Sequence, residues 1–284
     1  MEVILGTTVD LAAWQLAIMA AISLGVGLSG GVVGIALGVI RLPMLTLFGV
    51  DPLIAAGTNL MISVMGSTIG TFEAFFDQRV APVVVLAMGG PAIVGAFIGG
   101  YFADIVPIWV LLTVVTLLMA WSALFLIAWS IRIMRIRRRY PGSRLRRAMT
   151  GTVDGDEVEL DAKQVSRESA AGFVIGLIGG AVGLVLGVLR MPALLAMRMD
   201  PHKAAGTNLA ITVFVGIAGF AGHLLKGSVD WHLIAIVGAP GVLGMYVGTR
   251  LATRFDAAGL RLVVGIVVLL VAPAVLYGAI RNAV

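Results

Sequence analysis

One stretch of this sequence occurs twice without a gap, and the duplication limits the fold more than any other feature. Residues 27–60 (GLSGGVVGIALGVIRLPMLTLFGVDPLIAAGTNL) align with residues 176–209 (GLIGGAVGLVLGVLRMPALLAMRMDPHKAAGTNL) at a constant offset of 149 residues, and 20 of the 34 positions are identical. The identities are mostly glycines, an Arg-x-Pro, an Asp-Pro and an Ala-Ala-Gly-Thr-Asn-Leu. Chance similarity of two apolar segments would not keep these residues in register. We therefore expect one structural unit used twice, with its chemistry where the copies meet.

The composition is that of a membrane protein. Hydrophobic residues make up 60% of the chain and charged residues 12%, against about 45–50% and about 25% in soluble domains. A membrane-spanning helix needs about 20 mostly apolar residues. Eight long stretches lack Asp, Glu, Lys and Arg: residues 11–40, 52–72, 80–103, 105–131, 169–189, 204–225, 231–249 and 262–280. The fold class we expect is all-α: a polytopic bundle of membrane helices with about eight hydrophobic segments in two homologous halves.

A polar linker separates the two halves. We expect a first membrane repeat at residues 1–135, a linker at 136–167 and a second membrane repeat at 168–284. Most of the net charge of +5 lies in Arg132–Arg147, directly after an apolar run. Such a cluster is typical of a cytoplasmic segment that contacts anionic lipid, and it does not indicate nucleic acid.

The distribution of Lys and Arg favours an inverted repeat. If all eight segments cross the membrane, three basic residues outside the linker share its side and seven lie opposite, which contradicts the positive-inside rule. If the first element of each half re-enters and returns to the side it left, each half has three crossings and the count becomes seven to three in the expected sense. Broken or re-entrant helices and halves of opposite orientation are therefore expected.

Glycine and proline predict where the helices begin and break. The spacing of four residues in Gly30-Gly34-Gly38 and Gly179-Gly183-Gly187 predicts a face on which a neighbouring helix approaches closely. Pro43 and Pro192 predict a helix break. Asp51-Pro52 and Asp200-Pro201 read as an N-cap followed by proline in the first turn, and open a long helix in each half. Because glycine, threonine and asparagine are poor helix formers, we also expect local unwinding at 57–59 and 206–208.

Two arginines are the strongest candidates for binding a substrate. Arg41 and Arg190 are equivalent in the repeat and lie at the ends of apolar runs. A guanidinium suits an oxoanion through bidentate, charge-assisted hydrogen bonds. The alternative is that both side chains extend to the lipid headgroups.

Repeat-equivalent polar side chains could complete an anion site. Thr58, Asn59, Thr207 and Asn208 are neutral donors, and broken helices would add backbone N–H groups. Alternatively these four residues only hold the bundle together through hydrogen bonds between helices.

The remaining titratable residues indicate no enzyme and no metal site. Glu73 and His223 are candidates for a proton relay, although Glu73 and Asp77 equally suit a salt bridge with Arg79 at the membrane boundary, and His223 a structural position. No ligand spacing for a metal, no nucleophile–base pattern and no phosphate loop is present, so we expect no cofactor.

These motifs resemble the sulfite exporter TauE/SafE family. The resemblance rests on the doubled Gly-rich–Arg-x-Pro–Asp-Pro–Ala-Ala-Gly-Thr-Asn-Leu unit and on Gly222-His223-x-x-Lys226-Gly227-x-Val229-Asp230-Trp231, and covers both halves but not the linker. It implies a multi-pass transporter in the inner membrane of a bacterium or archaeon that exports small sulfur-containing anions such as sulfite, thiosulfate or sulfonates. Many members carry an unbroken glycine triplet where this chain has 35–38 and 184–187, and some carry Asp in place of Asn59 and Asn208; both departures concern the substrate.

Three functional hypotheses follow. The first is an exporter of small sulfur-containing anions, with the anion bound between the repeats. The second is a transporter or channel for another small anion, such as a carboxylate. The third is a membrane scaffold without transport activity. The expected partners are the anion and membrane lipid; homo-oligomerisation is left open by the sequence.

Overall fold

The structure is a computed structural model that describes residues 11–33, 37–139, 162–197, 199–251 and 257–281. Within these ranges the chain forms helices and no strand. The first half contains α1 (Ala13–Val33), α2 (Gly38–Leu47), α3 (Pro52–Phe76), α4 (Pro82–Val84), a π-helix η1 (Val85–Gly89), α5 (Gly90–Tyr101), a 3-10 helix η2 (Ala103–Ile105) and α6 (Ile108–Arg139). The second contains α8 (Ala162–Val182), α9 (Gly187–Ala196), α10 (Pro201–Leu225), α11 (Trp231–Leu251) and α12 (Ala257–Arg281).

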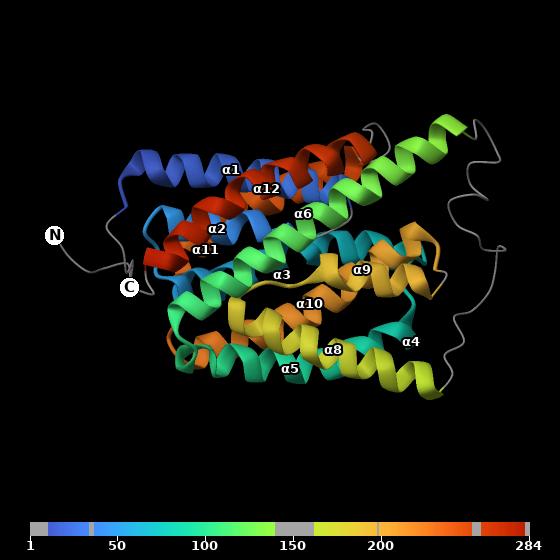
Figure 1. The fold of residues 1–284 in the computed structure, drawn as a ribbon, viewed down its shortest axis with the longest axis horizontal. Helices are drawn as coiled ribbons and strands as arrows, with labels where there is room; N and C mark the ends of the chain where they lie inside the picture. The colour runs from blue at the N-terminus through green and yellow to red at the C-terminus, as the bar shows by residue number, and fades with distance from the viewer. Residues whose placement is uncertain (1–10, 34–36, 140–161, 198, 252–256, 282–284) are drawn as a thin grey trace.

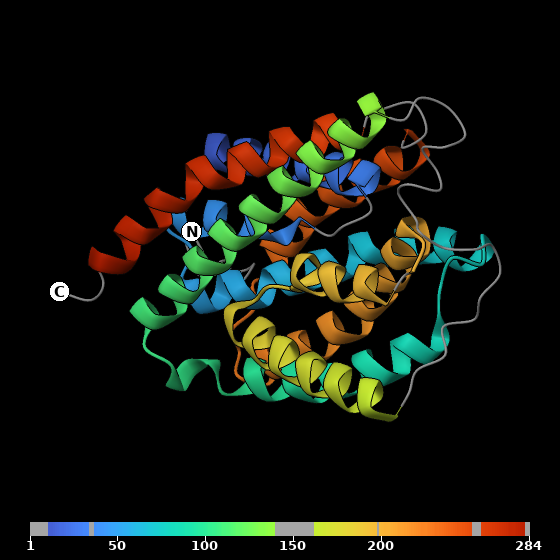
Figure 2. The ribbon, with the colours of Figure 1, turned by 45° about the vertical axis from the view of Figure 1, so that its right-hand side comes forward.

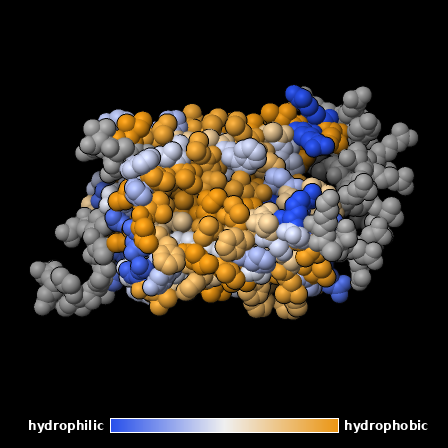
Figure 3. Space-filling model, turned by 60° about the horizontal axis from the view of Figure 1, so that its bottom comes forward, coloured by the Kyte–Doolittle hydropathy of each residue, from blue (hydrophilic) through white to orange (hydrophobic). Residues whose placement is uncertain are grey.

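Eight helical segments of the described chain are long and apolar enough to cross a membrane, as the sequence predicts. They correspond to α1, α3, α4–α5, α6, α8, α10, α11 and α12. On the face shown in Figure 3, apolar side chains cover the middle of the molecule and hydrophilic side chains gather towards its two ends. The bundle axis along which the helices run is therefore the direction of the membrane normal.

The two halves have opposite orientations, which confirms the predicted inverted repeat. In each half a full-length helix is followed by a ten-residue helix that turns back, α2 after α1 and α9 after α8. Three crossings follow, so the half ends on the side opposite to its start. The start of α1 and the end of α12 lie at one end of the bundle, here called the terminal end (Figure 1). The end of α6 and the start of α8 lie at the other, here called the linker end.

Helices of each half pack against helices of the other half, and the pairs are related by the repeat. α1 packs mainly on α11 of the other half, and its counterpart α8 packs on α5. α3 packs on α10, and α6 on α12. The α6–α12 pair forms one side of the bundle and the α5–α8 pair the opposite side (Figure 2). α3 and α10 are the most buried of the candidate spans, with 61% of each apolar window inside the protein. They are antiparallel, because Gly57 lies against His223 and its repeat equivalent Gly206 against Ala74.

Glycines let these paired helices touch backbone to backbone. A Cβ added at Gly27 of α1 would overlap the carbonyl oxygen of Gly241 in α11, and one at Gly176 of α8 would overlap that of Ala92 in α5. The prediction of a single face through Gly179, Gly183 and Gly187 is wrong. These residues belong to two helices with a break between them, and α8 makes its close contacts with η1 and α5 at Gly172, Gly176 and Gly180 instead. In the first half, Gly34 of the predicted face lies outside the described residues.

The break in each half falls before the arginine. The expected unwinding at 57–59 and 206–208 is absent, since α3 and α10 continue through these residues. Pro43 and Pro192 are inside α2 and α9, so the break predicted at the prolines is also misplaced. In the second half the chain leaves the helix at Gly183, which has a φ of +73° and lies against the backbone of Ala56. Only glycine tolerates both conditions.

The predicted caps are confirmed. The side chain of Asp51 accepts hydrogen bonds from the N–H groups of Leu53 and Ile54, and that of Asp200 accepts from His202 and Lys203. Proline occupies the first position of both helices. α6 extends to Arg139 and α8 starts at Ala162, so the expected linker is helical at both ends; its residues 140–161 lie outside the described ranges.

Candidate functional site

Arg41 is buried where the first three helices of the chain meet. It lies in the first turn of α2, and 5% of the residue is exposed. Its Nε donates a hydrogen bond to Ser23 Oγ of α1 at 3.1 Å, and its Nη1 donates to Asn59 Oδ1 of α3 at 3.4 Å. Both contacts are neutral, so they orient the guanidinium and leave its charge uncompensated.

Arg190 occupies the equivalent position of the second half. It is fully buried. Its Nε donates to Asn208 Oδ1 at 3.2 Å and its Nη2 donates to Thr212 Oγ1 at 2.8 Å, while its Nη1 has no hydrogen-bond partner. The Arg–Asn pair is thus built twice from repeat-equivalent residues.

Neither guanidinium has a carboxylate as a partner within the part of the chain that the structure describes. Their burial rules out the alternative that both arginines extend to the headgroups. A charge buried in a membrane protein is costly unless it is paired, and it marks a functional site by default. Two buried cations without acidic partners among the described residues are a chemical environment suited to an anion.

A narrow cavity adjoins Arg41. It is lined by α1, α2, α3 and α11, with Arg41, Ser63 and Ser67 as its side-chain donors and Gly27, Gly38 and Gly241 among its glycines. It has room for about one water molecule beside these donors. Arg190 is not among the lining residues, so this cavity belongs to one of two related sites and not to a hollow that both arginines share.

Asn59 connects the arginine to both halves. Besides accepting from Arg41, its Nδ2 donates to the carbonyl of Gly38 at 3.3 Å and to that of Gly183 at 2.9 Å. Asn208 differs, since its Nδ2 has no hydrogen-bond partner. In both halves glycine begins the short helix, because a Cβ at Gly38 or Gly187 would press on the asparagine amide.

Thr58 and Thr207 bind the backbone of the opposite half. Thr58 Oγ1 accepts a hydrogen bond from the N–H of Asp230 at 3.1 Å, and Thr207 Oγ1 accepts from the N–H of Ala81 at 3.0 Å. The two bonds are repeat-equivalent. These hydroxyls hold the two halves together and make no hydrogen bond with the arginines among the described residues. This agrees with the alternative that the threonines only stabilise the bundle.

The two candidates for a proton relay lie at opposite ends of the bundle. Glu73 is near the linker end of α3, where its Oε1 accepts from Thr249 Oγ1 at 3.3 Å. His223 is buried near the terminal end of α10, with its Nε2 2.9 Å from the carbonyl oxygen of Gly180. The expected salt bridge at the boundary is present between Asp77 and Arg79. Within the described residues, no three His, Asp or Glu side chains are close enough to hold a metal ion.

Sequence reasoning missed three residues of the site. Ser63 and Thr212 are repeat-equivalent and lie four residues after the asparagines, so a search for polar positions one helical turn apart would have found them. Ser23 has no polar counterpart in the second half, where Gly172 takes its place, and only the packing of α1 against α2 reveals it.

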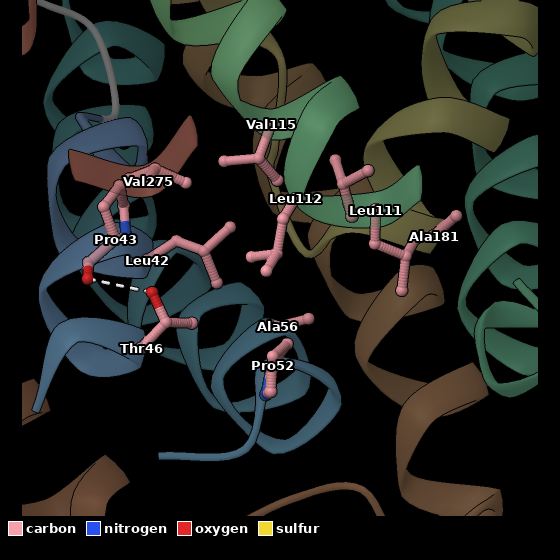
Figure 4. A pocket seen from close by; sticks show the side chains of 11 residues that line it. Leu42, Pro43, Thr46, Pro52, Ala56, Leu111, Leu112, Val115, Ala181 and Val275 are labelled. Carbon is pink, nitrogen blue, oxygen red and sulfur yellow. Dashed lines mark hydrogen bonds between the residues drawn. The ribbon is translucent and has the colours of Figure 1, made fainter. Parts of the chain in front are cut away.

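A second, apolar cavity lies on the other side of α2. It is lined by Leu42, Pro43, Leu111, Leu112 and other apolar side chains from α2, α3, α6, α8 and α12 (Figure 4). Its one hydroxyl, on Thr46, already donates to the carbonyl of Pro43 at 2.9 Å. With no free donor it does not suit an anion.

Comparisons with known proteins point to a family of transporters. The statistical model of the family described as sulfite exporter TauE/SafE matches residues 19–275. The chain is 23% identical over 279 residues to the "Probable membrane transporter protein YunE" of Bacillus subtilis (strain 168), which covers 93% of this chain and 98% of that protein. It is 28% identical over 258 residues to a "Probable membrane transporter protein" of Xylella fastidiosa (strain 9a5c), covering 86% and 91% of the two chains. No solved structure matches.

Proposed function

The chain belongs to the sulfite exporter TauE/SafE family, and on this premise we propose that it exports small sulfur-containing anions, such as sulfite, thiosulfate or a sulfonate like sulfoacetate, across the bacterial inner membrane. The single observation that best supports the proposal is the pair of buried guanidiniums, Arg41 and Arg190, which have no acidic partner in the described ranges of the chain. The substrate contributes the negative charge that the protein leaves out.

The two arginines recognise the anion through the arrangement of their guanidinium N–H groups. The parallel N–H groups of a guanidinium match the oxygen atoms of a sulfite or sulfonate group, which lysine could not do. Asn59 and Asn208 orient the guanidiniums through their side-chain oxygens. Because these contacts are neutral, the site attracts anions and rejects cations.

In this proposal the membrane potential favours export. Basic side chains of the described residues gather at the linker end: Arg79, Arg132, Arg135, Arg167, Lys203, Arg250 and Arg261. By the positive-inside rule, this end faces the cytoplasm. An inside-negative potential then favours the exit of an anion by about 2.3 kcal/mol per charge per 100 mV. Export needs no proton relay through Glu73 or His223 on this account.

A thermal unfolding screen on the purified protein tests the substrate class. A ligand at 100 times its Kd stabilises the folded state by about 2.7 kcal/mol. We expect sulfite, thiosulfate and sulfoacetate to raise the midpoint of unfolding, and acetate at the same concentration and ionic strength to leave it unchanged. If only acetate raises the midpoint of unfolding, the protein is instead a carboxylate transporter. An unchanged midpoint with every anion would favour a scaffold without transport.

A further inference from the structure

The two repeat-related sites differ in the side chains that follow them along the long helix of each half. On α3, the positions that follow Asn59 at intervals of four residues are Ser63, Ser67 and Thr71. Residues four apart lie on one face of a helix. On α10, the positions that follow Asn208 in the same way are Thr212, Gly216 and Phe220. One face of α3 thus carries three hydroxyls in a row, while the equivalent face of α10 becomes apolar after the first.

These three hydroxyls on α3 have no hydrogen-bond partner among the residues that the structure describes. Ser63 Oγ, Ser67 Oγ and Thr71 Oγ1 are buried, and none makes a hydrogen bond. Ser63 is 4% exposed and Ser67 1% exposed, and both line the cavity beside Arg41. Most buried hydroxyls bond to a backbone carbonyl, as Thr68 does with that of Val64 at 2.8 Å. Three buried hydroxyls without partners on one helix face are therefore available to hydrogen-bond a water molecule or an anion.

The equivalent space beside α10 is filled. At Gly216, the equivalent of Ser67, an added Cβ would meet Val64 Cγ2 and Val185 Cγ2, so apolar side chains already pack there. One turn further, Phe220 is 8% exposed and packs edge-on against Trp231 at 5.9 Å between ring centroids. Thr212 already accepts from Arg190. The Arg190 site is therefore closed towards the terminal end of the bundle.

We propose that the row of Ser63, Ser67 and Thr71, here called the hydroxyl track, is the path by which an anion passes between Arg41 and the linker end. The proposal rests on the proposed function, namely that Arg41 binds a small anion. The track runs about 12 Å along α3 from Ser63 to Thr71 and begins about one turn beyond Asn59. Neutral hydroxyls can replace part of an anion's hydration shell without holding it as tightly as a second cation would.

The charges at the linker end affect how readily an anion enters the track. Glu73 lies just beyond the track and accepts from Thr249, so its carboxylate is turned towards α11. Asp77 is paired with Arg79. Arg250 of α11 covers the ring of Tyr246, 4.3 Å from its centroid, and leaves its charge without an acidic partner among the described residues. Basic side chains outnumber acidic ones at this end, which raises the local concentration of anions.

The natural chain contains no cysteine, which makes the test direct. Ser67→Cys and Thr71→Cys each introduce one thiol into the track. Phe220→Cys is the repeat-matched control for Thr71→Cys, and Ser122→Cys, buried on α6, is the control for Ser67→Cys. The full-length variants in proteoliposomes are treated with a membrane-impermeant anionic maleimide and, separately, with its cationic analogue. Sulfoacetate and acetate serve as protecting anions, because sulfite itself consumes maleimides.

We expect both track thiols to react with the anionic maleimide, at least about tenfold faster than with the cationic one, while the Phe220→Cys and Ser122→Cys thiols remain unlabelled. Sulfoacetate should slow the labelling of Ser67→Cys. Silent track thiols, or labelling of Phe220→Cys as fast as that of Thr71→Cys, would overturn the track. If the track thiols react and only acetate protects them, the path is supported and the sulfur-anion assignment fails. The two proposals are thus distinguishable.

Discussion

The side-chain amide of Asn59 in α3 donates a hydrogen bond to the carbonyl of Gly183, 2.9 Å away, in the helix break of the opposite half. The same side chain accepts from Arg41 through its other atom. One asparagine therefore links the guanidinium of the first half to the irregular backbone of the second. A movement of one half against the other must stretch this bond, so the bond couples the arginine to the seam between the repeats.

Asn59→Ala should destabilise the protein more than the repeat-equivalent Asn208→Ala. Both changes remove the acceptor of an arginine, but only Asn59 also donates to the carbonyls of Gly38 and Gly183. Each such bond contributes about 0.5–1.5 kcal/mol. Thermal unfolding in one detergent should show the lower midpoint for Asn59→Ala, and equal midpoints would contradict the bridging role.

Gly27→Ala should separate α1 from α11, whereas Gly25→Ala in the same helix should not. A Cβ at position 27 overlaps the carbonyl of Gly241, while one at position 25 meets nothing within 4 Å. Alanine is favoured over glycine in a helix by about 1 kcal/mol, so Gly25→Ala is expected to be neutral or stabilising. Midpoints of thermal unfolding compare the two variants. A Gly27→Ala protein as stable as wild type would show that the close approach is dispensable.

Much of the fold could be predicted because repetition and helix signals are local. Asp51-Pro52 specifies its cap within four residues, and the constant offset of 149 residues identifies the two halves. The position of the helix break could not be predicted. Gly57 and Asn59 are weak helix formers, yet α3 stays helical because α10 and the start of α11 pack around it. Tertiary packing overrides propensity there.

The site was predicted in part for the same reason. Arg41 and Arg190 stand out as charges in apolar segments. Thr58 links the two halves by accepting a hydrogen bond from Asp230, 172 residues away, and no local sequence pattern predicts such a contact. Identity between the repeats does not reveal Ser67 and Thr71, because Gly216 and Phe220 stand at the equivalent positions of the second half.

The ion pair between Asp104 and Lys226 predicts a pH dependence at the terminal end. The Nζ of Lys226 donates to Asp104 at 2.9 Å, which lowers the pKa of Asp104 below 3.8 and raises the pKa of Lys226 above 10.5. The ion pair therefore stabilises the folded protein fully at any pH between the ordinary pKa values of Asp and Lys. It is lost as the pH falls through the lowered pKa of Asp104, or rises through the raised pKa of Lys226.

The Lys226→Met variant tests this prediction. Its thermal midpoint should lie below that of wild type by a constant, small amount from about pH 5 to pH 9, because the pair is exposed to solvent. The difference should shrink towards pH 3. A difference that grows on acidification would contradict the assignment of the pair.

Potential-driven flux in proteoliposomes tests the central claim, that the two buried arginines, which have no acidic partner in the part of the chain that is described, carry an anion across the membrane. Vesicles loaded with sulfite are given a potential of either sign, with wild type and with the Arg41→Ala, Arg190→Ala double variant, whose folding is checked by its elution and helical content. We predict that wild-type efflux speeds up when the sulfite-containing side is negative, slows when the sign is reversed, and disappears in the double variant. Efflux that ignores the sign of the potential and persists without both arginines would contradict the account.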